Sequence, residues 1–258
     1  ATNLVIGNGS TLRYVGSGDT TDRLFTLAPG VTFIESSGSG AINFNNTAAV
    51  TLSGANAART IALGGTNTGS NTLGGTIGDS GVGKTTLAKN DGGTWVLTGD
   101  NTYTGNTVIN DGNLVIGNGG TSGNAGAGNV IVDAATSKLS INRSDTFDFN
   151  GTLSGPGALA QIGTGTTRLT AAGNSIGATT VSAGTLQVAA GSDLTTATVA
   201  MNGTSTLDVA GTVQGSSGAA AVFTGDAGAS TINVAAGGTL LASGDLGAGS
   251  DSVNVTGT

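Results

Sequence analysis

Residues 77–117, IGDSGVGKTTLAKNDGGTWVLTGDNTYTGNTVINDGNLVIG, decide the fold that the sequence predicts. Short apolar groups recur in this stretch, separated by Gly, Asn, Asp and Thr: Trp95-Val96-Leu97, Val108-Ile109 and Leu114-Val115-Ile116. Runs this short, rich in β-branched residues and bounded by turn residues, are typical of strands joined by tight turns. No window keeps its apolar residues at helical spacing. The stretch therefore predicts all-β structure.

The same pattern recurs at a fixed offset further along the chain. The matching positions hold apolar residues, threonines and glycines: Leu87, Ala88, Thr94, Leu97, Thr98, Gly105, Thr107, Gly112 and Leu114 correspond to Leu159, Ala160, Thr166, Leu169, Thr170, Gly177, Thr179, Gly184 and Leu186. A repeated unit that cannot bury its apolar face alone indicates a solenoid. If the offset spans three rungs, a rung being one turn of the solenoid, each has about 24 residues and the chain on the order of eleven rungs. At roughly 4.8 Å per rung, we expect a rod of some 50 Å.

A family resemblance follows from these residues. The segments Gly93–Gly99 (GTWVLTG), Asn101–Thr107 (NTYTGNT) and Ile109–Leu114 (INDGNL) resemble the autotransporter-associated β-strand repeat, also called the passenger-associated transport repeat. The resemblance covers about forty residues strongly, and a second, degenerate copy runs from Leu153 to Val188. It implies a right-handed parallel β-helix displayed outside a Gram-negative cell, anchored to the outer membrane through a C-terminal β-barrel. It carries over no catalytic residues.

The predicted organisation is a single elongated β-helix segment over residues 1–258, with a strong repeat at 77–117 and a degenerate repeat at 153–188. Strand-like residues stand at both ends, Ala1–Ile6 and Asp251–Val255, so we expect a segment cut from a longer passenger. The Gly-, Ser- and Asn-rich residues 118–129 predict a long loop leaving the solenoid.

Composition excludes several classes of function. The net charge is −7 and no Lys/Arg cluster occurs, which argues against nucleic acid and against direct contact with anionic membranes. The chain has no Cys, which rules out disulfides and Cys-ligated metal sites. It also has no His, which removes the commonest general base and metal ligand.

One segment matches a nucleotide-binding pattern. Residues 78–85, GDSGVGKT, fit the P-loop, in which Lys84 would contact phosphate oxygens and Thr85 would bind magnesium. A P-loop needs a buried strand before it and a helix after it, but Asn90-Asp91-Gly92-Gly93 follows within five residues of Thr85. We therefore interpret the match as chance and predict no nucleotide cofactor.

Other chemistries find little support in the residue pattern. The carboxylate pairs Asp19/Asp22 and Asp145/Asp148 are the candidates for polysaccharide cleavage, and no basic cluster accompanies either pair. A Ser–Lys dyad has only three lysines available, and calcium-binding nonapeptides do not recur. We predict no enzyme, no catalytic residues, no cofactor and no metal site; binding residues are unknown from the sequence, and calcium stays open.

Several side chains have predicted positions. We expect Trp95 to be partly buried with its indole N–H bonded or at the surface, and Leu97 to point into the core. Val31 and Phe33, like Ile42 and Phe44, alternate with polar residues as in half-buried strands. Asp148 is expected to point outward between two inward phenylalanines, Phe147 and Phe149. Either an asparagine ladder or an ordinary loop remains open for Asn43, Asn45 and Asn46.

The sequence thus predicts a surface-exposed β-helical passenger segment of a Gram-negative autotransporter. We expect it to act as an adhesin or structural stalk in cell–cell or cell–surface adhesion, with repeats that support export and folding. The alternative is a polysaccharide-active β-helix enzyme. The expected partner is a second copy of the chain, because strand edges at the ends recruit other strands; a host glycan or matrix protein is the competing partner.

Overall fold

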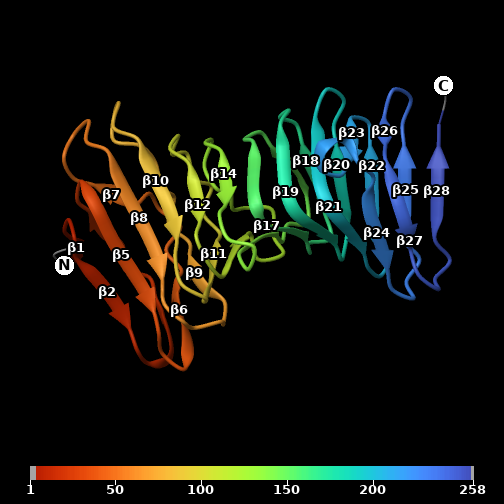
Figure 1. Ribbon diagram of the computed structural model, residues 1–258. Coiled ribbons are helices and arrows are strands. Elements are labelled where there is room, and N and C mark those ends of the chain that lie inside the picture. The colour runs from red at the N-terminus through yellow and green to blue at the C-terminus, as the bar shows by residue number, and fades with distance from the viewer. Residues whose placement is uncertain (1–3, 257–258) are drawn as a thin grey trace. The chain divides into compact units, whose positions relative to one another are not determined.

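The computed structural model describes residues 4–256 and is all-β, with parallel strands stacked as a β-solenoid of about 12 turns. Residues 1–3 of the predicted first strand lie outside the described residues. The chain divides into two compact units, the first formed by residues 4–118 and 122–138, the second by 119–121 and 139–256. Figure 1 shows the strands of each unit lying side by side. Between residues 4 and 256, no helix has the length and apolar character needed to cross a membrane.

In unit 1 the strands form three parallel faces. The first face is β2 (Thr11–Tyr14), β5 (Gly30–Ser36), β8 (Arg59–Gly64), β10 (Thr85–Lys89), β12 (Thr107–Ile109) and β14 (Val130–Val132). The second is β3 (Ser17–Thr21), β6 (Gly40–Phe44), β9 (Asn71–Leu73), β11 (Thr94–Leu97) and β13 (Asn113–Ile116). The third is β1 (Leu4–Ile6), β4 (Phe25–Leu27) and β7 (Thr51–Leu52). β15 (Lys138–Ile141) begins at the last residue of this unit.

In unit 2 long bent strands alternate with short ones. The bent strands are β17 (Leu153–Gln161), β19 (Asn174–Val181) and β21 (Asp193–Met201), continued by β23 (Thr212–Gln214) with β24 (Ala221–Gly225) and by β26 (Thr239–Leu240) with β27 (Ala242–Asp245). The short strands form a six-stranded sheet: β16 (Thr146–Phe149), β18 (Thr166–Leu169), β20 (Thr185–Val188), β22 (Thr206–Val209), β25 (Thr231–Val234) and β28 (Ser252–Val255). A 3-10 turn, η1 (Ser216–Gly218), separates β23 from β24.

Parallel register stacks the same side-chain position from rung to rung, and this builds the core. In unit 1, Leu73, Leu97 and Ile116 form one buried column across β9, β11 and β13. In unit 2 the column in the six-stranded sheet is Leu169, Val188, Val209 and Val234. Alternate residues along each strand point to opposite faces, so one inward column fixes the outward one as well.

Rungs vary in length more than the single value predicted from the repeat offset. Thr166 pairs with Thr185 on the next rung, whereas Val31 pairs with Thr60, so the rung that begins at Val31 is much the longer of the two. The difference lies in the loops, because the paired segments stay in parallel register while the chain between them varies in length. Loops at the surface tolerate such changes in length.

The predicted loop at residues 118–129 has no strand, as expected, but the part in unit 1 does not leave the solenoid. Its backbone follows the previous rung: Asn124 N–H donates to Gly99 O at 3.3 Å and Ala127 N–H to Tyr103 O at 2.8 Å. Ala125 is buried. The prediction of a departing loop was wrong because backbone hydrogen bonds hold this segment in place without apolar strand residues.

The structure reverses one predicted strand face. In β5, Thr32 and Ile34 are buried, whereas Val31 is exposed and Phe33 is half-buried. The register explains the reversal, since Ile34 stacks on the buried Leu63 of β8. In β6 the buried residue is Ile42, as predicted, and Phe44 is half-buried with its ring edge-on to Phe25 at 5.6 Å between centroids.

Trp95 is more buried than predicted. Its side chain is fully enclosed, and its indole N–H donates to Gly64 O at 2.9 Å. The hydrogen bond confirms one part of the prediction, and it explains how so large a polar-edged ring is buried without leaving an unpaired donor. Leu97 is fully buried in the same strand, which confirms its predicted inward position.

Candidate functional site

The segment that resembles a P-loop forms a tight turn that its own side chains fill. Ser80 and Gly83 exchange backbone hydrogen bonds of 3.0 Å, and the strand β10 follows directly at Thr85. The Asp79 carboxylate accepts from Thr85 N–H at 2.7 Å and from the Thr104 hydroxyl at 2.6 Å. A carboxylate thus takes the place that a phosphate would need, and a strand replaces the helix whose N-terminus would hold the anion.

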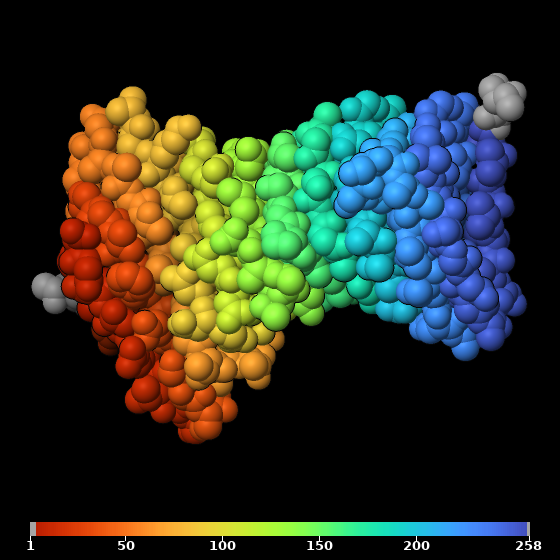
Figure 2. All heavy atoms as spheres, in the orientation of Figure 1, coloured from red at the N-terminus to blue at the C-terminus, as the bar shows by residue number. Residues whose placement is uncertain are grey.

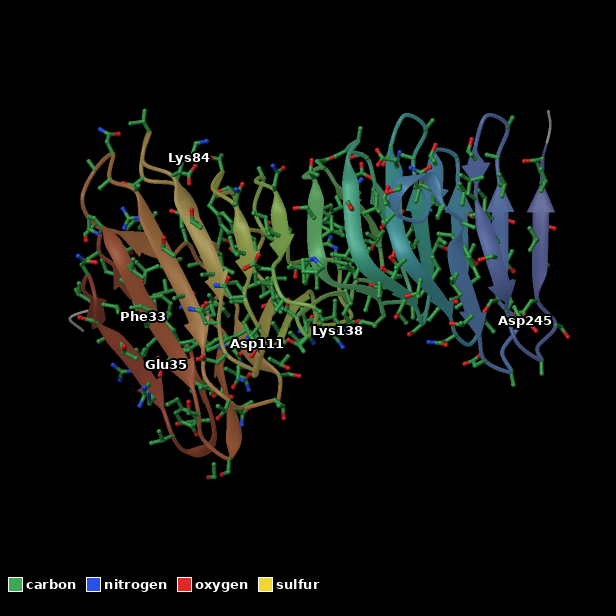
Figure 3. All side chains as sticks on the ribbon, viewed as in Figure 1. Phe33, Glu35, Lys84, Asp111, Lys138 and Asp245 are labelled. Atoms are coloured by element: carbon green, nitrogen blue, oxygen red, sulfur yellow. The ribbon has the colours of Figure 1, made fainter. Side chains whose placement is uncertain are left out.

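The residues proposed for the P-loop chemistry are otherwise engaged or remote. The Thr85 hydroxyl donates to Gly78 O at 2.7 Å, so it is turned into the segment rather than toward a metal ion. Lys84 is exposed, and Figure 3 shows it where the turn enters β10. Its charge helps to lower the pKa of Asp79: burial pushes this pKa up, but hydrogen bonds from Thr104 and Thr85 together with Lys84 outweigh the effect.

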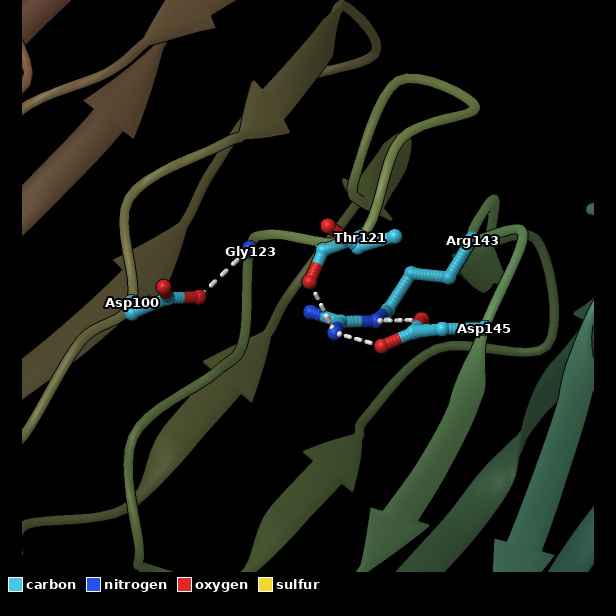
Figure 4. Close-up of polar contacts among 5 residues, drawn as sticks. All are labelled: Asp100, Thr121, Gly123, Arg143 and Asp145. Carbon is cyan, nitrogen blue, oxygen red and sulfur yellow. Dashed lines mark hydrogen bonds and ion pairs between the residues drawn. The ribbon is translucent and has the colours of Figure 1, made fainter.

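The carboxylates of the pair Asp145/Asp148 are each bound to a different arginine. Arg143 makes a two-pronged contact with Asp145, through Nε at 2.9 Å and Nη2 at 2.7 Å (Figure 4). Asp148 points outward as predicted and accepts from Arg168 Nη1 at 2.9 Å. The sequence interpretation missed these arginines, because one comes from two residues upstream and the other from the next rung.

These contacts oppose acid catalysis. The hydrogen bond from Arg143 is the largest influence on Asp145 and holds the pKa of its carboxyl below the ordinary value. A general acid in glycoside hydrolysis needs a raised pKa instead. In the other pair, Asp19 and Asp22 are both exposed, and the Asp19 carboxylate accepts from the N–H of Thr20 at 2.8 Å.

The three lysines occupy two kinds of environment. Lys84 and Lys138 are exposed, whereas Lys89 is fully buried and its Nζ contacts backbone carbonyl oxygens rather than a serine hydroxyl. Within residues 4–256, no group of three or more acidic side chains lies close enough together to hold a metal ion.

Asparagine side chains do bond to one another between rungs, although at other positions than the three proposed. Asn110 donates to Asn90 at 2.7 Å and Asn254 donates to Asn233 at 2.9 Å, in both cases side chain to side chain. Asn46 instead donates to the backbone oxygen of Asp22 at 2.7 Å.

The six-stranded sheet of unit 2 presents a regular polar outer face. One outward row is Thr146, Thr166, Thr185, Thr206, Thr231 and Ser252, and the other is Asp148, Arg168, Gln187, Asp208, Asn233 and Asn254. Most neighbours in the second row are hydrogen-bonded, for example Arg168 Nε to Gln187 at 2.8 Å and Asn233 to Asp208 at 2.7 Å. Such rows of hydrogen-bonded side chains stabilise the stack.

Each unit also has a cavity beside its outermost described strands, and the one in unit 2 has both polar and apolar lining residues. In unit 1 a cavity of about 690 Å³ is lined by Leu4, Leu12, Phe25, Ile34 and Phe44, among others. In unit 2 a cavity of about 440 Å³ is lined by Phe223, Ile232, Leu240 and Val253, among others. The cavity of unit 1 lies at its first described rung and that of unit 2 at its last described rung, where the core opens to solvent. The space-filling view shows the rungs of each unit as successive bands of colour (Figure 2).

Sequence reasoning missed the buried polar residues of the repeats, above all Lys89 and Gln161. A signal was present: the alternation of Thr85, Leu87 and Lys89 puts the lysine on the inward face, and Gln161 holds the same repeat position in the second copy. The overlap with the P-loop pattern drew attention to Lys84 instead.

The fold and these surfaces define a parallel β-solenoid whose polar outer face suits contact with other molecules. Comparison with protein families identifies the repeats: residues 87–116 and 159–188 match the model of the passenger-associated-transport-repeat. The two matched ranges begin at Leu87 and Leu159, which correspond in the sequence pattern.

A known protein is similar over a longer range. The chain is 65% identical over 157 residues, 61% of its length, to a protein named Adhesin BmaC autotransporter from Brucella suis biovar 1 (strain 1330). That range is only 4% of the relative. No solved structure gives a significant match. Together the repeats and this similarity support an autotransporter passenger with passenger-associated transport repeats.

Proposed function

We propose that this chain is part of the surface-exposed passenger of a Gram-negative autotransporter and acts in adhesion through contact along its solenoid. The observation that carries the proposal is the 65% identity to a segment of an autotransporter adhesin, within a fold that stacks polar side chains in rows. The chain spans only 4% of that relative. The adhesive role named for the relative is therefore our proposal for this chain.

The fold suits this role physically. Each rung bonds its backbone to the rungs on either side, so the outer side chains are free to vary without loss of the scaffold. Outward rows such as Thr166, Thr185 and Thr206 repeat at the strand spacing of roughly 4.8 Å. A surface of this kind gains affinity by repetition of weak contacts rather than by one deep pocket.

The repeats, in this proposal, support export and folding. Their matched residues are core and turn positions, for example the buried Leu87, Leu97 and Leu114. Solenoids fold by adding rungs to a formed neighbour. A repeat with a large, well-packed core is suited to provide the first stable neighbour.

Surface display tests the adhesive proposal. The chain is placed between a secretion signal and the membrane anchor of a characterised autotransporter, and binding of the bacteria to each other, to host cells, to matrix proteins and to glycans is counted. We expect binding above that of bacteria displaying a solenoid of unrelated surface. Display at equal density without any gain in binding would contradict the adhesive role.

The alternative of a polysaccharide-active enzyme is tested with the purified chain. Incubation with a panel of polysaccharides, followed by measurement of new reducing ends and of unsaturated products, is expected to show no turnover, since Asp145 and Asp148 are bound to arginines. Any depolymerisation would revive the enzyme.

We further propose that the isolated chain associates with copies of itself. Apolar side chains of the outermost described strands are exposed, among them Val5 at 60% in unit 1 and Val255 at 70% in unit 2. β1 pairs with β4 and β28 pairs with β25, which leaves one edge of each strand open among the described residues. Open strand edges with apolar side chains recruit other strands. A host glycan or matrix protein is the competing partner.

A further inference from the structure

A charged side chain stands inside an apolar column of unit 1. Parallel register stacks Ile34, Leu63, Lys89, Ile109 and Val132 on the first face, and all five are buried. A lysine is among the residues least often found fully buried, because its charge loses hydration there. Its position in this column therefore requires compensation by hydrogen bonds.

Backbone carbonyl groups supply that compensation. Lys89 Nζ donates to Asn90 O at 2.6 Å, to Asp91 O at 2.6 Å and to Asp111 O at 3.0 Å. An ammonium group has three N–H donors, so all three are used. The nearby carboxylates are engaged with other rungs: Asp91 accepts from Gly65 N–H at 2.8 Å, and Asp111 accepts from the Thr136 hydroxyl at 3.4 Å.

The three acceptors belong to two successive rungs. Asn90 and Asp91 form the turn that follows β10 in the same rung, whereas Asp111 lies in the turn that follows β12 in the next rung. The two turns approach closely, since a Cβ added at Gly112 would lie 2.5 Å from Asp91 O and 2.4 Å from Gly93 O. Gly112 also has φ of +71°, so only glycine fits there without strain.

The second repeat fills the equivalent position differently. Gln161 is buried and donates through Nε2 to Gly163 O at 2.8 Å and to Gly165 O at 3.2 Å, while its Oε1 accepts from the Thr167 hydroxyl at 2.7 Å. These partners all lie in its own rung, within six residues of Gln161. Both repeats thus use a buried donor to satisfy turn carbonyls, but the longer lysine also reaches the next rung.

We propose that Lys89 is a latch between two rungs: it closes the turn of the first repeat and, through Asp111 O, couples that turn to docking of the rung at residues 107–117. The inference rests on the proposed folding role of the repeats and names the residue that performs it. Before that rung docks, the third N–H of Lys89 lacks its acceptor and the ammonium faces solvent. After docking, the ammonium group is enclosed. Withdrawal of Lys89 from this position would then leave three carbonyl groups without their donor. Because this cost arises only once the next rung is in place, rung addition becomes cooperative.

Amide hydrogen exchange on the purified chain tests the latch. Lys89→Gln supplies the side-chain amide that caps the turn in the second repeat and loses the reach to Asp111. Trp95 stands where the second repeat has Thr167, so the amide oxygen of the variant lacks the hydroxyl partner that Gln161 has. Lys89→Met keeps an unbranched apolar side chain one atom shorter than lysine and removes every donor. Lys84→Gln is the matched control, because it removes the same charge from an exposed position of the same segment.

Three sets of amides report separate events. Asn110 and Asn113 donate to Lys89 O and Gly93 O and report the turn of the next rung. Asn90 and Gly93 donate to Leu63 O and Gly65 O and report the latch's own turn. Residues of β4 report the stability of unit 1 as a whole.

In Lys89→Gln we expect exchange at Asn110 and Asn113 to be faster by about tenfold, as for loss of a hydrogen bond to a charged group, with Asn90, Gly93 and β4 unchanged. Lys89→Met should open both turns.

Unchanged exchange at Asn110 and Asn113 in Lys89→Gln would overturn the latch. So would equal acceleration in β4, which would mark Lys89 as a general core residue, or equal acceleration in Lys84→Gln. If Lys89→Met does not fold, the exchange rates of Lys89→Gln alone decide whether the latch exists. Failure of the adhesion assay would leave this result untouched, because no display or binding enters it.

Discussion

An inward position in this solenoid tolerates little change of side chain, because each inward residue is stacked between the residues of two neighbouring rungs. Leu97 is fully buried between Leu73 and Ile116. We expect Leu97→Asp to lower the free energy of unfolding by several kcal/mol, since it encloses an unpaired carboxylate. Urea denaturation followed by Trp95 fluorescence measures the loss. The control is Thr102→Asp at an exposed position of the same repeat; equal losses in both variants would show that the strand faces are assigned wrongly.

Lys89 makes stability depend on pH in the alkaline range. Burial lowers the pKa of Lys89 from 10.5 to about 8, with the charges of Asp91 and Asp111 opposing the shift. Between these two pKa values the unfolded chain binds more protons at this residue than the folded chain, so stability rises with pH. The full effect is on the order of 3 kcal/mol at most.

Comparison with Lys89→Gln isolates this contribution. The free energy of unfolding is measured in urea at pH 7 and at pH 9.5 for both proteins. We expect the parent to gain relative to the variant on going to the higher pH. A relative loss would mean that the ammonium form is the better stabilised one, with a pKa above that of a free lysine.

The sequence predicts inward side chains best where neighbouring residues alternate in the same way between apolar and polar. Leu97 and Asp148 were placed correctly because apolar and polar residues alternate around them. Lys89 and Trp95 were not placed as the structure has them, because their burial depends on carbonyl groups of other rungs. The pattern within one strand carries no information about those acceptors.

The turn at residues 78–85 shows how one element can carry a misleading pattern. Its carboxylate, Asp79, joins two rungs by accepting from Thr85 N–H and from the Thr104 hydroxyl. We expect Asp79→Ala to cost about 1 kcal/mol, since it leaves the part-buried N–H of Thr85 unpaired while the exposed Thr104 donors turn to water. Lys84→Ala is expected to leave stability unchanged, because this side chain is exposed.

Calorimetry with ATP and magnesium completes the test of this element. We expect no binding heat with the parent or with Lys84→Ala. Measurable affinity in the parent that disappears in Lys84→Ala would restore the nucleotide-binding interpretation that the geometry opposes.

Strand positions were predictable from short apolar groups bounded by turn residues, as at β11, β12 and β13. The inward face of β5 was not predictable from the sequence. Val31, Phe33 and Ile34 are all apolar, so the local pattern does not decide whether odd- or even-numbered residues point into the core. The choice comes from stacking of Ile34 on Leu63, a residue of the next rung. Residues 122–127 likewise depend on hydrogen bonds to the rung before them.

For the whole molecule, the secondary structure gives a direct spectroscopic expectation. The described residues contain strands and one short 3-10 turn, Ser216–Gly218. Far-ultraviolet circular dichroism of the purified chain should therefore show β-structure with almost no helix. A helical contribution above a few per cent of residues would contradict the solenoid.

Copies of the isolated 258-residue chain are expected to associate in solution. Exposed apolar residues occur on β1, with Leu4 at 50%, and on β28, with Val253 at 57%. The net charge of −7 is small for this length, so electrostatic repulsion between copies is weak. Sedimentation velocity over a concentration series should show a sedimentation coefficient that rises with concentration. Combining Val5→Lys with Val255→Lys places charges on the open edges and should reduce association, because charged edges oppose strand pairing. A parent that stays monomeric at the highest concentration would contradict homotypic association and favour a glycan or matrix protein as the partner.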